Sequence, residues 1–453
     1  MKIFERRVYS QLLDWKRRLA GKYALLLEGA RRVGKTCVIK RFAETEYSSF
    51  IYIDFSMTDR RTSDAKKAFG KAKDIADLLL RLQLIFEVKL VDGESCLIFD
   101  EVQRFPVARE AIKHLVAYGR YHYIESGSLV GIKENVRDIV IPSEEHKLKM
   151  YPLDFLEFLD ATGHTMIKEE VLRCQAEKTL PLPELHQSAI DLFRLYMVVG
   201  GMPQSVAAYV SADGEDGLQA SEYAKREILS LYEADIGKYA KGYASKVRDV
   251  FHMVPSALNR HERKFHLTAI SPDARMRRYE NAFLWLEDAM IVNTARNAFN
   301  PNLEMDMSID GSSFKCYLLD TGLLVTMAMG TGKASDLRIL RGILHDNLGI
   351  NEGMFFENVV AQMLVAQGDE LRFYSRKNLR SPHDTMEIDF LVKRGIKIVP
   401  IEVKSGRYRA HASLDRFLEK FKRNVSVGYV CCSGNYETAG DVVYLPAYMA
   451  SSI

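Results

Sequence analysis

The segment from Gly29 to Thr36 limits the possible folds of this chain more than any other feature of its sequence. It reads GARRVGKT and fits the pattern GxxxxGK(S/T). An apolar, strand-like run, Tyr23–Leu27, precedes it, and a helix-like stretch through Val38 and Phe42 follows it. A glycine-rich turn in this position directs backbone N–H groups and a helix N-terminus at a phosphate. The pattern therefore predicts a nucleotide-binding α/β domain.

Two side chains of this loop have expected roles in binding ATP and Mg²⁺. The ammonium group of Lys35 should neutralise the β- and γ-phosphate oxygens, a catalytic role, and the Thr36 hydroxyl should ligate the metal ion. The alternative is a strand–helix turn that binds no ligand. The predicted cofactor-binding residues of the loop are Gly29, Ala30, Arg31, Arg32, Val33, Gly34, Lys35, Thr36 and Cys37.

A second motif, Cys96–Glu101, reads CLIFDE and predicts a buried strand that ends in two acids. We expect Asp100 to hold Mg²⁺ through water, and Glu101 to orient and deprotonate the attacking water as a catalytic base. Strands often end in exposed acids, so the motif gains weight from its place roughly 60 residues after a phosphate loop. The apolar run Phe50–Phe55 between the two motifs favours P-loop ATPases with a catalytic glutamate over kinase-like proteins.

The next strand-like run, Tyr121–Ile124, is followed by Glu-Ser-Gly-Ser. Either Ser126 or Ser128 could contact the γ-phosphate or the attacking water, and Ser126 is counted with the cofactor-binding residues. The alternative is an ordinary turn at a strand end. Together with helix-like stretches such as Asp74–Leu90, these runs alternate strand and helix, which indicates a parallel sheet.

Length, charge and cysteine content set wider limits. The 453 residues allow two to four domains, and a net charge of +3 does not by itself argue for a polyanionic partner. The charged N-terminus lacks the apolar core of a signal peptide, and no stretch approaches the roughly 20 apolar residues of a membrane span. Six scattered cysteines without a CxxC pair indicate reduced, buried thiols. These features predict a cytoplasmic protein that does not bind membranes.

Nine stretches along the chain carry a resemblance to a known family: LLLEGARRVGKT, LIFDEVQRFP, ESGSL, MYPLDFLEFL, VVGGMPQSV, YLLDTGLL, FFENVVAQML, EIDFLV and IEVKSG. In these stretches and in their order, the chain resembles a prokaryotic family of AAA-type ATPases that carry a C-terminal domain of unknown function. The resemblance implies an α/β fold with four parts: a P-loop ATPase core with a parallel sheet (1–160), a helical lid (161–240), a winged-helix-like module (241–330) and a C-terminal α/β nuclease-like domain (331–453). It also implies homo-oligomers, which many AAA-type ATPases form.

The chain departs from this family at one functional position. Many relatives carry Gly-Arg just before a PLSF-like segment, where this chain reads Pro-Ser-Glu-Glu from Pro142 to Glu145. An arginine finger cannot come from that position. Arg104 and Arg137 remain as alternatives.

Acidic residues in the last quarter of the chain suggest a second site. Asp389 lies in EIDFLV, and Glu402 and Lys404 follow in IEVK, where they project to the same side of a strand. A hairpin about Gly395 would bring Asp389 opposite Glu402 or diagonally across from it, and diagonal neighbours about 7–8 Å apart can share one hydrated Mg²⁺. Glu357, in FFENVVAQML, could add a third acid.

These acids resemble the PD-(D/E)xK nuclease core. The resemblance implies that Asp389, Glu402 and Lys404 are catalytic, and that Glu357, Asp389 and Glu402 bind a metal ion, which would activate water. The alternatives are an exposed acid–x–Lys pair on a strand edge, and a relative that has kept these residues without activity.

Basic clusters near both C-terminal modules make DNA the expected macromolecular partner, because such side chains can neutralise phosphates. The alternative is that they are solvated helix faces. Two hypotheses follow: an ATP-driven enzyme that acts on DNA, or a nucleotide-dependent switch for a protein–protein interaction with an inert nuclease-like domain. The clusters contain Arg260, His261, Arg263 and Lys264, then Arg275, Arg277 and Arg278, and finally Arg407, Arg409, His411, Arg416, Lys420, Lys422 and Arg423.

Overall fold

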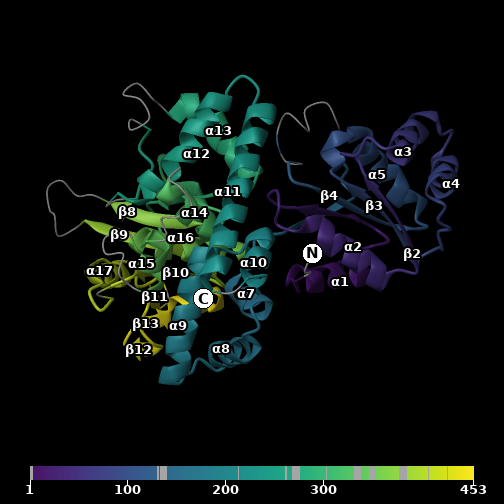
Figure 1. Ribbon diagram of the computed structural model, residues 1–453. Coiled ribbons are helices and arrows are strands. Elements are labelled where there is room, and N and C mark those ends of the chain that lie inside the picture. The colour runs from purple at the N-terminus through teal and green to yellow at the C-terminus, as the bar shows by residue number, and fades with distance from the viewer. Residues whose placement is uncertain are drawn as a thin grey trace. The chain divides into compact units, whose positions relative to one another are not determined.

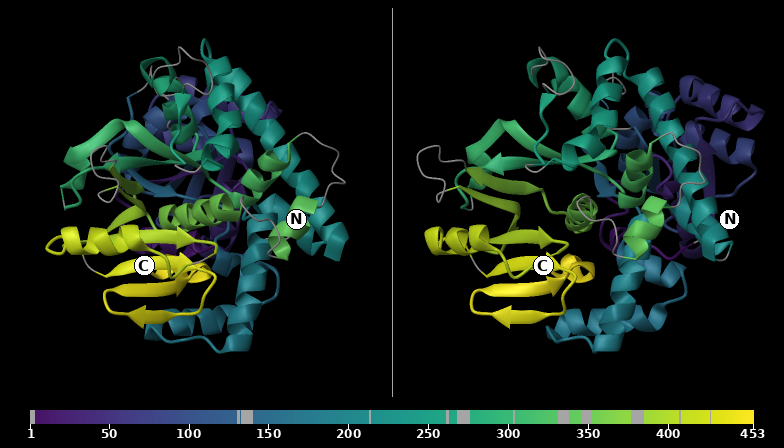
Figure 2. Two further views of the ribbon diagram at one scale, coloured as in Figure 1. Left: turned by 90° about the vertical axis from the view of Figure 1, so that its left-hand side faces the viewer. Right: turned by 60° about the vertical axis from the view of Figure 1, so that its left-hand side comes forward.

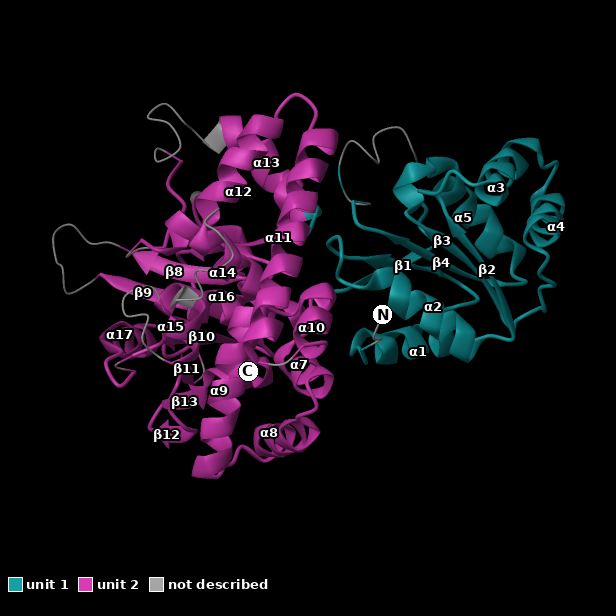
Figure 3. Cartoon of the chain, in the orientation of Figure 1, with its two compact units in different colours: residues 1–151, 288–290 teal, residues 152–287, 291–453 magenta. Residues whose placement is uncertain are grey.

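The computed structural model forms two compact units. Unit 1 comprises Met1–Tyr151 and Asp288–Met290, and unit 2 comprises Pro152–Glu287 and Ile291–Ile453 (Figure 3). Each unit has its own sheet. The residues that the structure describes are 4–129, 132, 140–212, 214–260, 263–267, 276–302, 304–330, 338–345, 352–376, 385–406, 408–425 and 427–453.

Unit 1 contains the predicted parallel sheet, with five strands in the order β2-β3-β4-β1-β5 (Figure 1). The predicted apolar runs form β1 to β4, as expected for strands covered on both faces, whereas β5 is a polar edge strand that was not predicted. The strands are β1 (Ala24–Glu28), β2 (Ser49–Asp54), β3 (Ser95–Asp100), β4 (His122–Gly127) and β5 (Glu145–Lys149). The helices are α1 (Val8–Arg18), α2 (Lys35–Glu46), α3 (Arg60–Lys71), α4 (Ile75–Phe86), the 3₁₀ turn η1 (Val102–Arg104) and α5 (Pro106–Tyr118).

Helices α3, α4 and α5 cover one face of this sheet. Their apolar side chains and those of the strands form one buried cluster that includes Leu79, Leu97, Phe99 and Ile112. Helix α2 contacts β2, β3 and β4 without contributing to that cluster, so it covers the other face. Strand β4 lies between β1 and β3, and because the three are parallel, their carboxyl ends meet at one edge of the sheet.

Unit 2 is built on a mixed sheet of eight strands, in the order β12-β13-β11-β10-β9-β8-β6-β7 (Figure 2). Strands β6 and β7 fall in the segment predicted as winged-helix-like, and β8 to β13 fall in the predicted nuclease-like domain. Pairing of β6 with β8 joins the two segments in one sheet, and the four-part division of the chain stays a prediction. The strands are β6 (Val292–Ala298), β7 (Ile309–Leu318), β8 (Arg372–Arg376), β9 (Met386–Arg394), β10 (Lys397–Lys404), β11 (Gly428–Cys432), β12 (Glu437–Ala439) and β13 (Val442–Pro446).

Helices α9, α10 and α11 follow one another between residues 183 and 239. Helix α13 ends at Asp288, Met290 has a left-handed φ of 55°, and β6 begins at Val292. Ile291 and Val292 extend the apolar helical pattern, yet β-branched side chains also suit a strand. The described helices of unit 2 are α7 (Phe155–Ala161), α8 (Thr165–Glu177), α9 (Pro183–Val199), α10 (Pro203–Val210), α11 (Gly214–Tyr239), α12 (Ala244–Leu258), α13 (Met276–Asp288), η3 (Met305–Ser308), α14 (Thr321–Met329), α15 (Arg338–Leu344), α16 (Glu352–Ala366), α17 (Ala412–Lys420) and η6 (Ala447–Ser452).

The hairpin predicted about Gly395 is present between β9 and β10. Ile401 pairs with Phe390 in an antiparallel register, and Gly395, with a φ of 58°, is the first of two loop residues. The two-residue hairpin turns whose twist matches that of the strands require a positive φ at this position, which glycine adopts at little cost. The same register, continued by one residue, brings Asp389 opposite Glu402.

Buried hydrogen bonds join four of the stretches that carry the family resemblance. The Leu153 N–H donates to the Gly201 carbonyl at 2.7 Å, and the Tyr196 hydroxyl donates to the Leu153 carbonyl at 2.7 Å. The Gln362 amide donates to that hydroxyl at 2.8 Å, and Asp320 accepts from the Gly201 N–H at 2.6 Å. The segments MYPLDFLEFL, VVGGMPQSV, YLLDTGLL and FFENVVAQML therefore have a structural role in the core of unit 2.

Candidate functional site

The predicted phosphate loop lies between β1 and α2, which begins at Lys35. Arg32 and Gly34 have left-handed φ angles of 71° and 100°, a conformation that glycine adopts at little cost. Gly29 has no room for a side chain, because a Cβ atom there would lie 2.5 Å from the Met150 carbonyl oxygen. The loop is thus a compact turn that leads into the first N–H groups of a helix, an arrangement suited to phosphate binding.

Lys35 is buried at this turn. Its Nζ donates hydrogen bonds to the carbonyl oxygens of Gly29 at 2.7 Å and Ala30 at 3.0 Å. Burial lowers the pKa of Lys35 to about 8, although the nearby carboxylates of Glu101 and Asp100 favour its charged form. The ammonium group is therefore held on the loop itself, where a phosphate oxygen could replace a carbonyl as its partner.

Asp100, at the carboxyl end of β3, accepts hydrogen bonds from three hydroxyl groups. Thr36 Oγ1 and the Tyr52 hydroxyl each lie 2.7 Å from Asp100 Oδ2, and Ser126 Oγ donates to Oδ1. Burial and then the charge of Asp100 raise the pKa of Tyr52, so this hydroxyl stays protonated as a donor. Oxygen atoms are the ligands that Mg²⁺ prefers, and the adjacent Thr36 and Asp100 oxygens fit such an ion.

Glu101 directly follows β3 and has a left-handed φ of 51°. Its Oε2 accepts a hydrogen bond from the Gln103 side-chain amide at 2.6 Å. Burial raises the pKa of Glu101, and the positive charge of Lys35 opposes that shift. A carboxylate with a raised pKa is a better proton acceptor than an ordinary one, which suits a general base.

The other residues predicted for this site lie in different surroundings. Ser128 is buried, like Ser126, whereas Arg104 is exposed at the end of η1. Arg137 lies outside the described residues. Neither candidate for an arginine finger is tested by this structure.

Cys37 departs from the expectation that all six cysteines are buried. Its side chain is exposed in the first turn of α2, whereas the other five are buried. The expectation was wrong here because Val38, Ile39 and Phe42 form the buried face of the helix. All six thiols are free.

Arg6 is a further contact of the phosphate loop that the sequence did not indicate. Its guanidinium group donates to the Val33 carbonyl at 2.8 Å and to the Tyr151 carbonyl at 2.6 Å. It therefore fixes the loop to the chain segment that follows β5. An arginine in a charged N-terminal segment gives no pattern by which this role could be found.

Two of the three acids predicted in the C-terminal part, Asp389 and Glu402, line a pocket of about 340 Å³ in unit 2. Asp389, Glu402 and Lys404 line it, together with Glu387 and Arg263. Asp389 Oδ2 accepts a hydrogen bond from the Val403 N–H at 2.9 Å, and Lys404 Nζ lies 2.6 Å from Glu402 Oε1. The structure thus brings these three predicted residues together on neighbouring strands.

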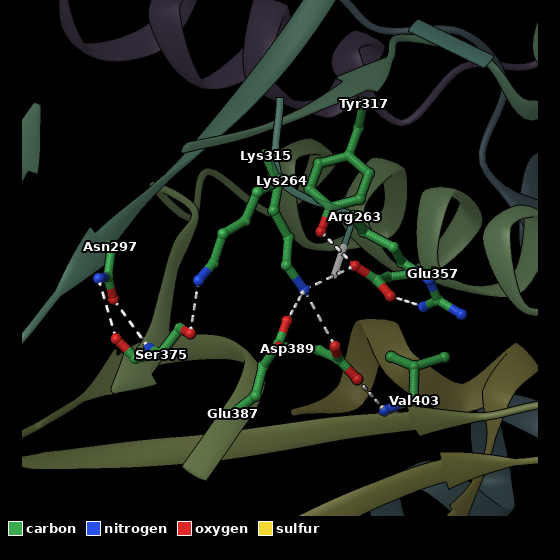
Figure 4. A network of polar contacts seen from close by, with 10 residues as sticks. All are labelled: Arg263, Lys264, Asn297, Lys315, Tyr317, Glu357, Ser375, Glu387, Asp389 and Val403. Atoms are coloured by element: carbon green, nitrogen blue, oxygen red, sulfur yellow. Dashed lines mark hydrogen bonds and ion pairs between the residues drawn. The ribbon is translucent and has the colours of Figure 1, made fainter. Parts of the chain in front are cut away.

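Lys315, on β7, is the residue of this pocket region that sequence reasoning missed. Its Nζ lies 3.1 Å from Glu357 Oε1, 3.2 Å from Glu387 Oε1 and 3.1 Å from Asp389 Oδ1 (Figure 4). Glu357 also accepts a hydrogen bond from the Tyr317 hydroxyl at 2.5 Å and pairs with Arg263. One signal was available: Lys315 interrupts an otherwise apolar run, FKCYLL.

Several cations of the predicted basic clusters bind other parts of unit 2. Lys264 donates to the Ser375 hydroxyl, Arg416 to the Thr385 carbonyl, and Arg409 pairs with Glu437. Arg260, Arg278, Lys420, Lys422 and Arg423 are exposed, and Arg263 pairs with Glu357 as described above. His261, Arg275, Arg407 and the side chain of Arg277 lie outside the described residues.

Three segments of the chain match family models. Residues 21–159 match a model described as an AAA domain, and residues 190–334 and 352–448 match models described as the domains of unknown function DUF8612 and DUF4143. The first match supports the predicted AAA-type P-loop core and a nucleotide-binding, ATPase-like function, and the parallel sheet fits such a core. The last match fits the predicted C-terminal domain of unknown function.

Other comparisons add little. No curated protein matches the chain. Among solved structures, the helicase domain of Hef from Pyrococcus furiosus is 12% identical, with 94% of this chain and 89% of that chain covered and a TM-score of 0.19. Protein VC1899 from Vibrio cholerae is 9% identical, with 89% and 95% covered and a TM-score of 0.18. Likenesses this distant bear on neither fold nor function. Across the described residues, no helix is long and apolar enough to span a bilayer.

Proposed function

We propose that residues 21–159 bind ATP with Mg²⁺ and hydrolyse it to ADP and phosphate. The main support is the convergence on one carboxylate, Asp100, of hydroxyl groups from Thr36 and Ser126. Lys35 and Glu101 are close enough for each to shift the pKa of the other. A metal ligand, a cation for phosphate and a general base are the groups that this reaction requires.

In this proposal, each of these side chains has one role in the reaction. Lys35 would move from the loop carbonyls to the β- and γ-phosphate oxygens. Thr36 would hold Mg²⁺ directly and Asp100 through water, and the bound ion would neutralise and orient the phosphates. Glu101 would accept the proton of the attacking water as the new P–O bond forms and the bond to the ADP oxygen breaks. Ser126, or Ser128, would contact the γ-phosphate or the water.

Separate measurements of binding and hydrolysis test this proposal. Glu101→Gln keeps the size of the side chain but cannot accept the proton, so hydrolysis should fall roughly 10²–10⁴-fold while nucleotide binding remains. Lys35→Ala should weaken both binding and hydrolysis. Glu110→Gln, at an exposed glutamate of α5, is the matched control and should leave both unchanged. Normal turnover by Glu101→Gln would exclude this residue as the base.

For the rest of the chain, the action on DNA inferred from the sequence stays a proposal. Its support is the group of exposed cations at the end of α17 and beyond it, Lys420, Lys422 and Arg423. ATPase activity should then rise with single-stranded, duplex or branched DNA, and binding should weaken steeply with salt. Neither effect would be seen if the basic residues are only solvated surface.

The second candidate is a nucleotide-dependent switch that controls a protein–protein interaction. One observation favours it: Arg263, Lys264, Arg409 and Arg416 have partners within unit 2, which leaves them less available to phosphates. Such a switch should hydrolyse ATP at a rate that DNA does not change. DNA-stimulated turnover would count against it.

A further inference from the structure

One ammonium group lies among three carboxylates beside the acidic pocket of unit 2, and two of these carboxylates, Glu387 and Asp389, line that pocket. Lys315 is completely buried on β7, and its Nζ is 3.1–3.2 Å from Glu357 on α16 and from Glu387 and Asp389 on β9 (Figure 4). A lysine ammonium has three N–H donors. Three acceptors at hydrogen-bonding distance therefore use its full capacity, and the side chain connects three separate elements.

A divalent cation would need these same oxygen atoms. Mg²⁺ binds oxygen ligands at about 2.0–2.1 Å and Ca²⁺ at about 2.3–2.6 Å, usually with carboxylates from several elements. In Glu357 and Asp389, two of the three metal ligands predicted for this site, one carboxylate oxygen is paired with Lys315. The other carboxylate oxygen of Asp389 accepts a hydrogen bond from the Val403 N–H. Within the described residues, no three acidic, histidine or cysteine side chains are grouped as ligands of a metal ion.

The charges of the pocket are also nearly balanced without a metal ion. Three carboxylates that line it, and that of Glu357 beside it, face three cations: Lys315 shared among three of them, Arg263 on Glu357, and Lys404 at 2.6 Å from Glu402. A metal ion entering here would meet little uncompensated negative charge.

We propose that Lys315 is a built-in cation that takes the place of a divalent metal ion at the acids of this pocket. The acids of the nuclease-like site then stabilise unit 2, and the site does not cleave phosphodiesters by a metal-dependent reaction. This inference concerns unit 2 alone and is independent of the proposed ATPase.

Binding of Mn²⁺ to the full-length protein without nucleotide, followed by electron paramagnetic resonance, tests this idea. Wild type and Asp389→Asn should bind Mn²⁺ equally, because neither has a pocket site. Lys315→Met removes the cation and keeps an unbranched apolar side chain, so it should gain one Mn²⁺ site. Adding Asp389→Asn to Lys315→Met should remove that site again.

Lys225→Met is the matched control, because Lys225 is equally buried in unit 2 but pairs with Glu222 away from the pocket. It should gain no Mn²⁺ site. Two results would overturn the inference: Mn²⁺ binding by wild type that Asp389→Asn abolishes, or a folded Lys315→Met that gains no site. If Lys315→Met does not fold, the comparison of wild type with Asp389→Asn still decides. Mn²⁺-dependent DNA cleavage that is lost in Asp389→Asn would also refute it.

Discussion

Among single residues, Asp100 shows how much of the nucleotide site could be predicted from sequence. Thr36 and Asp100 belong to local patterns, and a hydrogen bond between them joins the two motifs. Tyr52 belongs to no pattern, because a tyrosine in a strand looks like any other half-buried residue. Only the pairing of β2 with β3 brings its hydroxyl to Asp100. Contacts that depend on the order of the strands in the sheet therefore could not be predicted from the sequence.

The lowered pKa of Lys35 predicts that ATP binding takes up protons. With a pKa of about 8, Lys35 is about half protonated at pH 8 in the free protein, and bound phosphate should raise this pKa. Binding should therefore take up about half a proton at pH 8 and almost none at pH 6. Affinity should fall as pH rises above 8, because the neutral amine must first gain a proton.

Calorimetric titrations in buffers with different ionisation enthalpies measure this uptake. Lys35→Met has no titrating amine and should show no such proton uptake at pH 8, although its binding will be weak. Equal uptake at pH 6 and pH 8 would contradict the assignment to Lys35.

Among the elements, the apolar strands β1 to β4 and the β9–β10 hairpin were predicted, whereas the polar edge strand β5 and the long-range partners were not. The β9–β10 hairpin followed from alternation and from Gly395, both of which are local. Lys315 reaches Glu357, 42 residues later in the chain, through the packing of α16 against β7. A single charged residue in an apolar run, such as Lys315, indicates a buried ion pair. The sequence of the run does not identify the acids with which it pairs.

The glycine pair that precedes α10 gives a prediction about packing. A Cβ atom at Gly201 would lie 2.1 Å from the Leu153 carbonyl oxygen. Gly201→Ala should therefore destabilise the protein by about 1–3 kcal/mol, the usual cost of overpacking. Urea unfolding measures this as a lower midpoint.

Gly70→Ala is the control for that substitution. Gly70 lies within α3, and a Cβ atom there would meet nothing within 4 Å. Alanine should stabilise this helix by about 0.5–1 kcal/mol, because glycine loses more backbone freedom on folding. If Gly201→Ala is also neutral or stabilising, the close contact with Leu153 does not limit this position.

For the whole molecule, each of the two units has its own sheet, and the proposed ATP site belongs to one of them. A ligand at 100 times its Kd stabilises the state that binds it by about 2.7 kcal/mol. In hydrogen exchange, Mg²⁺ and a non-hydrolysable ATP analogue should therefore slow the most protected amides of β1 and β3 roughly 100-fold. Peptides from β9 and β10 are the internal control, and equal slowing there would contradict a site confined to residues 21–159.

The contacts of the phosphate loop with Arg6 and Met150 have a consequence for the residues at which the chain leaves unit 1. A Cβ atom at Gly29 would lie 2.5 Å from the Met150 carbonyl oxygen, and Arg6 donates hydrogen bonds to both the Val33 and the Tyr151 carbonyls. The polypeptide enters unit 2 at the next residue, Pro152. A nucleotide that changes the conformation of this loop would therefore act on the residues directly before the chain leaves unit 1.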